Sequence, residues 1–118
     1  MAGNLKRIST HVLDTSQGKP ATGVPVRLDR KEPSGEWTQI STGQTDTDGR
    51  CAQLLMEGKE FGVGEYRIAF GTEIYFRSKG VDGLYPQIEI MFQVREGESH
   101  YHIPLLLSSN GYTTYRGS

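Results

Sequence analysis

The chain has 118 residues, of which 35% are hydrophobic, and it contains 15 glycines and 5 prolines. This length suits one domain with a single core, and the many turn formers favour a globular β protein over a helical bundle or a disordered chain. A formal net charge of −1 gives no reason to expect a nucleic acid or an anionic membrane as partner.

Cysteine content and hydropathy set the expected location of the protein. Cys51 is the only cysteine in the sequence, so no disulfide can form within the chain and nothing demands an oxidising compartment. No stretch of the sequence is apolar for long enough to cross a bilayer. We therefore expect a single domain spanning residues 1–118, in a soluble, cytoplasmic protein.

Short runs in which apolar and polar residues alternate predict strands along most of the chain. In the first run Ile8 and Val12 share one face, whereas Arg7, Ser9 and His11 share the other. The runs that predict strands span residues 5–13, 24–30, 36–44, 64–71, 87–94 and 100–108, and a last one follows residue 111. Short strands in this number and at this spacing are typical of a β-sandwich.

Residues 72–80 are the one stretch that predicts a helix. Thr72 suits the N-cap, Lys79 falls in the last turn, and Gly80 is typical of the residue that follows a helix. The stretch 18–23 is rich in turn formers and predicts a loop.

The segment 45–50 is a tight Asp-Gly turn that ends in Arg50. Its Asp-x-Asp-Gly sequence resembles a fragment of a calcium loop, but Arg50 places a cation where a ligand would be needed. The turn instead presents Arg50 at a fixed place, either as a functional group or as a solvated turn arginine. Cys51, directly after it, is interpreted as a small apolar filler.

The last nineteen residues predict two strands joined by the turn 108–111. Side chains on the first of these strands alternate between faces. One face carries Tyr101, Ile103, Leu105 and Leu107, and the other carries His100, His102, Pro104, Leu106 and Ser108. The first set suits a core, whereas two imidazoles beside apolar groups indicate more than a solvated surface.

The candidate functional groups are His11, His102, Arg50, Arg116 and the terminal Ser118. An imidazole near its reference pKa can take a proton from water, and a guanidinium can stabilise an oxyanion, so the set suits hydrolysis of a small, carbonyl-rich substrate. Zinc held by the three histidines is an alternative, but no carboxylate lies at a clear ligand spacing and we expect no metal. Spacing alone does not bring these groups together, and a solvated strand histidine remains the simpler interpretation of His11.

Two stretches of the sequence resemble the signatures of the transthyretin family. The first comprises residues 11–14 with Gly18, 20–21, Val24 and Val26, and the second comprises 101–104 through 107–108 with 111–113. The ending Tyr115-Arg116-Gly117-Ser118 is similar to the terminal tetrapeptide that separates the 5-hydroxyisourate hydrolases of this family from its hormone carriers. Ser109-Asn110 departs from the residues usual at the final turn.

The resemblance implies an all-β, transthyretin-like sandwich of two four-stranded sheets with one short helix, assembled as a homotetramer around a central channel. It implies hydrolysis of the small molecule 5-hydroxyisourate in urate degradation, without a cofactor. The residues that it implies are His11, Arg50, His102 and Ser118 as catalytic groups, and Tyr115 and Arg116, with His11 and Arg50, as substrate-binding groups.

Two other functions stay open at this point. A transthyretin-like carrier would bind an aromatic or other apolar ligand in the same channel, although histidines and arginines make that channel polar and cationic. A structural sandwich without a site would leave the histidines without a role.

Overall fold

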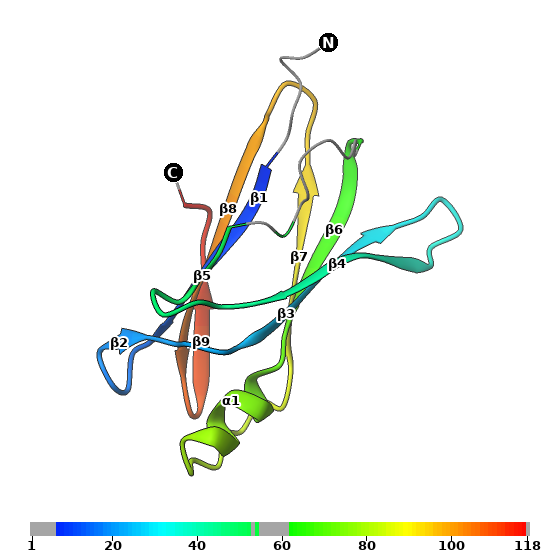
Figure 1. Cartoon of the computed structure of the whole chain (residues 1–118). Helices are drawn as coiled ribbons and strands as arrows, with labels where there is room; N and C mark the ends of the chain where they lie inside the picture. Colours follow the sequence, from blue (N-terminus) through cyan, green and yellow to red (C-terminus); the bar gives the residue numbers. More distant parts are fainter. Residues whose placement is uncertain (1–6, 53, 55–61, 118) are drawn as a thin grey trace.

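The computed structural model describes residues 7–52, 54 and 62–117, which form two β-sheets and one helix (Figure 1). The helix, α1 (Thr72–Ser78), lies between the sixth and seventh strands. The strands are β1 (Arg7–Asp14), β2 (Lys19–Pro20), β3 (Pro25–Lys31), β4 (Trp37–Gln44), β5 (Arg50–Cys51), β6 (Gly64–Phe70), β7 (Ile88–Val94), β8 (His100–Ser108) and β9 (Gly111–Thr114).

The first sheet has the order β2-β1-β8-β9 and the second has the order β4-β3-β6-β7. Strands β1 and β8 are parallel, and the other pairs are antiparallel. Strand β5 also pairs with β1, through Thr10 with Cys51 and His11 with Arg50. The predicted sandwich with one short helix is therefore confirmed, and β5 is a fifth strand in the first sheet.

Strands β2 and β5 are two residues long, and the sequence did not predict them as strands. Two residues carry no alternation that could be detected, and Lys19–Pro20 was expected to be part of a loop. They become strands because both pair with β1.

The alternation predicted for β1 and β8 places their apolar faces in the core. The buried side chains of the two sheets and the helix form one cluster, which includes Ile8, Val12, Val26, Leu28, Tyr66, Ile68, Phe70, Tyr75, Ile103, Leu105 and Leu107. Burying each of the larger side chains contributes roughly 1.5–3 kcal/mol. This burial fixes which face of β1 and β8 is left to solvent, and that face carries the histidines.

The N-cap of helix α1 lies one residue earlier in the chain than the sequence predicted. Gly71 occupies the N-cap position, and the Thr72 hydroxyl donates to the Tyr85 carbonyl at 2.6 Å instead of capping the helix. Gly80 follows the helix with a φ of +69°, in agreement with its predicted place. The Tyr75 hydroxyl donates to Asp14 Oδ2 at 2.7 Å and so ties the helix to β1.

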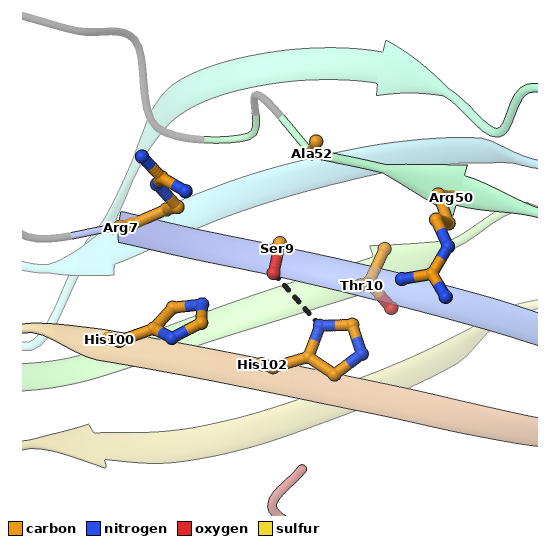
Figure 2. Close-up of a pocket in the computed structure, with 7 residues that line it drawn as sticks. All are labelled: Arg7, Ser9, Thr10, Arg50, Ala52, His100 and His102. Atoms are coloured by element: carbon orange, nitrogen blue, oxygen red, sulfur yellow. Dashed lines mark hydrogen bonds between the residues drawn. The ribbon is translucent and has the colours of Figure 1, made fainter. Parts of the chain in front are cut away.

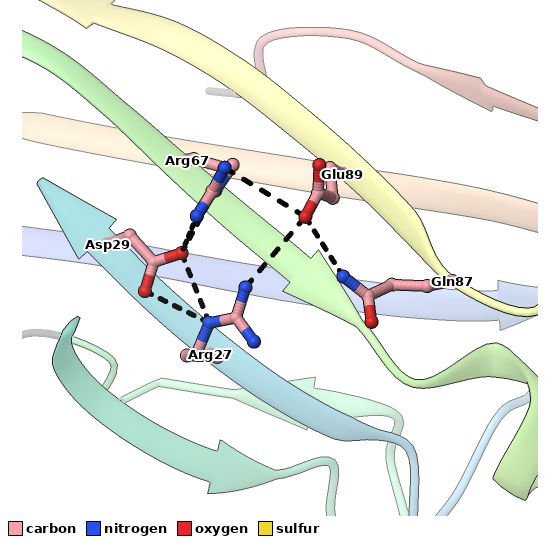
Figure 3. A network of polar contacts seen from close by, with 5 residues as sticks. All are labelled: Arg27, Asp29, Arg67, Gln87 and Glu89. Carbon is pink, nitrogen blue, oxygen red and sulfur yellow. Dashed lines mark hydrogen bonds and ion pairs between the residues drawn. The ribbon is translucent and has the colours of Figure 1, made fainter. Parts of the chain in front are cut away.

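The outer face of the second sheet carries a network of ion pairs between side chains of β3, β6 and β7 (Figure 3). Arg67 Nη2 lies 2.8 Å from Asp29 Oδ2, and Arg27 Nε lies 3.0 Å from Asp29 Oδ1. The Arg67 guanidinium also lies 4.3 Å from the centre of the Trp37 ring. Asp29 is 2% exposed, and a buried carboxylate needs partners for its charge. The guanidinium groups of Arg27 and Arg67 are these partners.

Candidate active site

His100, His102 and Arg50 come together on the outer face of the first sheet, where β5, β1 and β8 lie side by side (Figure 2). The parallel register pairs Ser9 with His102, and the antiparallel register on the other edge of β1 pairs His11 with Arg50. Three segments that are distant in the sequence thus bring His11, Arg50 and His102 to one face of the sheet.

The His102 ring is half-buried and held in place by its neighbours on β1. Its Nδ1 lies 2.9 Å from the Ser9 hydroxyl, and its ring centre lies 6.4 Å from that of His11. Burial lowers the pKa of His102 below its ordinary value of 6.5, and the positive charges of Arg50, His11 and His100 lower it further. His102 is therefore a neutral imidazole at pH 7, which is the form that can accept a proton.

The turn before β5 fixes both Arg50 and the ring of His11. His11 Nε2 donates to the Asp48 carbonyl at 2.9 Å. Asp46 Oδ1 accepts from the backbone N–H groups of Asp48 and Arg50, at 2.9 and 3.0 Å. The N–H group of Arg50 is the main cause that holds the pKa of Asp46 below its usual range, so this carboxylate stays ionised and keeps the turn closed.

Gly49 allows this turn to lie close against β1. Its φ is +76°, and a Cβ atom at this position would lie 2.4 Å from the Val12 carbonyl oxygen. The Gly49 carbonyl in turn accepts from the Val12 N–H at 2.7 Å. No other residue type fits this approach without a backbone shift.

An open pocket of about 190 Å³ lies beside these groups. Its described lining consists of Arg7, Ser9, Thr10, Arg50, Ala52, His100 and His102, with no carboxylate among them (Figure 2). Two guanidinium groups without a lining carboxylate make the pocket electropositive, so it suits a planar anion or a developing oxyanion. Among the residues that the structure describes, no three His, Cys, Asp or Glu side chains are grouped as metal ligands.

The C-terminal segment passes over His102. Gly117 pairs with His102, and its N–H donates to the His102 carbonyl at 2.8 Å. A Cβ atom at residue 117 would lie 2.5 Å from His102 Cδ2, so only glycine allows the segment to approach the ring this closely. Ser118 lies outside the described residues, and its catalytic role stays a prediction.

Arg116 and Tyr115 line a second pocket, together with Tyr101 and Ile103. The Arg116 guanidinium lies 4.5 Å from the centre of the Tyr101 ring and 3.3 Å from Glu98 Oε2. Tyr101 belongs to the inward face of β8, opposite to that of His102. Within one chain, the Arg116 side chain is therefore directed away from the imidazoles, and the substrate-binding roles of Tyr115 and Arg116 stay predictions.

A family model described as HIUase/Transthyretin family matches residues 8–117 of this sequence. The chain belongs to this family. It is 50% identical over 117 residues to the 5-hydroxyisourate hydrolase of Salmonella dublin, a match that covers 99% of this chain and 84% of the relative. The mouse 5-hydroxyisourate hydrolase is 42% identical over 119 residues, with all of both chains covered.

Solved structures of the HIUase/transthyretin family include both of its functional branches. Sea bream transthyretin in complex with thyroxine matches with a TM-score of 0.87 and 36% identity, over 93% of each chain. Klebsiella pneumoniae 5-hydroxyisourate hydrolase matches with a TM-score of 0.83 and 32% identity, over 97% of this chain and all of the other. The backbone alone therefore does not distinguish a 5-hydroxyisourate hydrolase from a transthyretin in complex with thyroxine, and the side chains of the site must do so.

The sequence did not single out two of the residues that line the site of this family member, Ser9 and Arg7. Both share the outward face of His11, and that signal was present in the alternation of β1. What the sequence lacked was the pairing of β1 with β8, which places Ser9 opposite His102 and Arg7 opposite His100.

Proposed function

We propose that this chain is an enzyme that hydrolyses 5-hydroxyisourate by opening its six-membered ring. The observation that carries the proposal is the electropositive pocket lined by Arg50 and His102, with the centre of the His11 ring 6.4 Å from that of His102. Its relatives from Salmonella dublin and mouse, matched over nearly the whole chain, bear the name of this activity.

The reaction proceeds by addition of water to a ring carbonyl. Neutral His102 takes a proton from the water as its oxygen bonds to the carbonyl carbon, a contribution of about 10²–10⁴-fold. The Arg50 guanidinium stabilises the oxyanion that develops. The ring C–N bond then breaks as the imidazolium returns its proton to the leaving nitrogen, and the new carboxylic acid loses its proton to water and becomes a carboxylate. The product is 2-oxo-4-hydroxy-4-carboxy-5-ureidoimidazoline.

His11 orients the substrate in this proposal. Its Nε2–H is directed to the Asp48 carbonyl, so a neutral His11 ring has its lone pair on Nδ1. A lone pair at this place accepts a hydrogen bond from a ring N–H of the substrate, and substrates of this class carry several. His102 is thereby left as the general base.

The assembly that we propose is a homotetramer, in which a neighbouring subunit brings Tyr115 and Ser118 of its C-terminal segment to the pocket. Supporting features are the edge strands β7 and β9, one from each sheet, and exposed apolar side chains near the end of the β8–β9 hairpin. Leu84 is 61% exposed and Tyr112 is 44% exposed. Exposed apolar groups beside unpaired strand edges are typical of an interface.

Hydrolysis is tested by following the ultraviolet absorbance of freshly made 5-hydroxyisourate with and without the protein. We expect decay far above the buffer rate, with the ring-opened product identified by ¹³C NMR. A rate equal to that of the buffer blank would refute the proposal.

A thyroxine-type carrier is the second candidate, because sea bream transthyretin has the same backbone and is solved with thyroxine. Isothermal titration with thyroxine on the same preparation separates the two functions. Tight binding without hydrolysis would establish the carrier, whereas hydrolysis without binding would exclude it.

No helix in the described part of the chain is long and apolar enough to span a membrane. The cytoplasmic location expected from the sequence stays a prediction. Fractionation of the source cells, with immunodetection of the protein in each fraction, tests it.

A further inference from the structure

A cluster at the turn between β7 and β8 holds the side chain of Arg116 in three ways. Its Nη1 lies 3.3 Å from Glu98 Oε2, and its Nη2 donates to the His100 carbonyl at 3.1 Å. Its guanidinium also lies 4.5 Å from the centre of the Tyr101 ring, within the range of a cation–π contact. An ion pair, a hydrogen bond and a ring contact together define one position for this long side chain.

The partners of Arg116 are themselves fixed. The Tyr101 hydroxyl donates to Glu98 Oε1 at 2.6 Å and accepts from the Arg95 N–H at 2.7 Å. Tyr101 is 2% exposed, so its ring is part of the rigid core. The hydrogen bond from Tyr101 is the main cause that lowers the pKa of Glu98, and the carboxylate is therefore ionised at neutral pH. The Glu98 carboxylate thus lies ready to bind the guanidinium.

The segment that carries Arg116 continues the β8–β9 pairing without a change of register. Leu105 pairs with Thr114, and His102 pairs with Gly117. His102 lies three residues before Leu105 and Gly117 lies three residues after Thr114, as an antiparallel register requires. Residues directly opposite each other in such a ladder project to the same face. A side chain at position 117 would therefore project to the same face of the sheet as the His102 ring, and only glycine leaves room for the ring.

We propose that Glu98 and Tyr101 are positioning residues for the hydrolytic site, because they anchor Arg116 and thereby hold Gly117 against His102. This inference rests on the proposed function. Release of the anchor allows residues 115–117 to leave the edge of β8, which removes the backbone packing that fixes one side of the imidazole. The rate falls because a general base must lie within hydrogen-bond reach of the attacking water.

Direct binding of the substrate by Arg116 is the competing role, and it predicts different kinetics. If Arg116 binds the substrate directly, Arg116→Gln raises KM, and Glu98→Gln has little effect on either kcat or KM. An anchor formed by both residues predicts that each variant lowers kcat by about 10-fold, with a smaller change in KM. It also predicts that the double variant is no worse than the worse single variant, because the two residues act as a unit.

The experiment is a double-mutant cycle of Glu98→Gln and Arg116→Gln, with kcat and KM measured for 5-hydroxyisourate. Tyr101→Phe is the second variant, since it keeps the ring and removes only the hydroxyl that orients Glu98. Glu96→Gln is the matched control, as an exposed carboxylate in the same turn. Wild-type kinetics in Glu98→Gln and Tyr101→Phe, or additive losses in the cycle, would overturn the inference.

A second readout does not depend on the activity. The heteronuclear ¹H–¹⁵N NOE of the Gly117 amide reports the order of the segment, and we expect it to fall in Glu98→Gln and Arg116→Gln but not in Glu96→Gln. An unchanged Gly117 NOE in both anchor variants contradicts the anchor. A wild-type protein that fails to hydrolyse 5-hydroxyisourate overturns the proposed function instead, and the Gly117 measurement then still decides whether the anchor exists.

Discussion

At the scale of single residues, the site depends on keeping one imidazole neutral among cations. Burial removes part of the water that would stabilise a charged His102, and the Arg50 guanidinium repels a further positive charge. In the proposed reaction, the guanidinium that stabilises the oxyanion thus also helps to keep the general base unprotonated. In this proposal the charge of Arg50 therefore acts both on the oxyanion and on the pKa of His102.

Arg50→Ala is predicted to raise the pKa of His102 towards 6.5, because one of the cations that lower it is removed. The sign follows from the charge: a neutral neighbour makes protonation easier, so the acid limb of activity moves to higher pH. The NMR titration of the His102 Cε1–H signal measures this shift without any need for activity. An unchanged or lowered pKa would contradict the electrostatic account.

Gly117→Ala is predicted to lower kcat by about 10-fold while leaving the free energy of unfolding almost unchanged. The added methyl group would lie 2.5 Å from His102 Cδ2, so either the ring or the segment must move. Gly111→Ala is the matched control in the same hairpin, since its Cβ atom would make an ordinary contact of 3.7 Å with Ser108 Oγ. Equal kcat values for the two variants would show that the close approach does not matter.

At the scale of elements, the alternation of β1 and β8 was sufficient to predict the faces that carry Ile8 and His102. It could not predict that these strands pair in parallel, because they are more than eighty residues apart and register is set by the folded core. The N-cap was wrong by one residue for a similar reason: the Thr72 hydroxyl finds a tertiary partner in Tyr85. The family resemblance supplied the residues of the candidate site, whereas the structure supplied their contacts.

The turn before β5 is the element that brings Arg50 to the site, and Gly49→Ala tests it. A left-handed conformation costs a residue with a side chain about 1–2 kcal/mol, and the clash with the Val12 carbonyl adds to this cost. Gly18→Ala is the control, because Gly18 has a similar φ of +68° but nothing within 4 Å of its added Cβ atom. Chemical denaturation should show a larger loss of stability for Gly49→Ala, with a loss of kcat that Gly18→Ala lacks.

At the scale of the whole molecule, one chain leaves the pocket open, and the edge strands of both sheets, including β7 and β9, have one side without a strand partner among the described residues. The sequence predicted a tetramer only through the family resemblance, since an interface is a property of a surface that forms after folding. Apolar side chains such as Leu84 gain burial only if a second chain covers them.

Sedimentation velocity is predicted to show a species of about four times the chain mass of 13.1 kDa. Leu84→Asp is expected to shift the distribution to smaller species, because it places a charge in the proposed interface. A wild-type protein that stays monomeric at micromolar concentration would contradict the tetramer, together with the proposed contribution of a neighbouring subunit.

The most direct test of the proposed site is the rate of 5-hydroxyisourate hydrolysis by wild-type protein, His102→Asn and Arg50→Ala, each verified as folded by circular dichroism. We predict fast hydrolysis by the wild type and a loss of about 100-fold or more in kcat for both variants, since one removes the general base and the other the oxyanion partner. Folded His102→Asn protein that retains the wild-type rate would show that the chemistry takes place elsewhere.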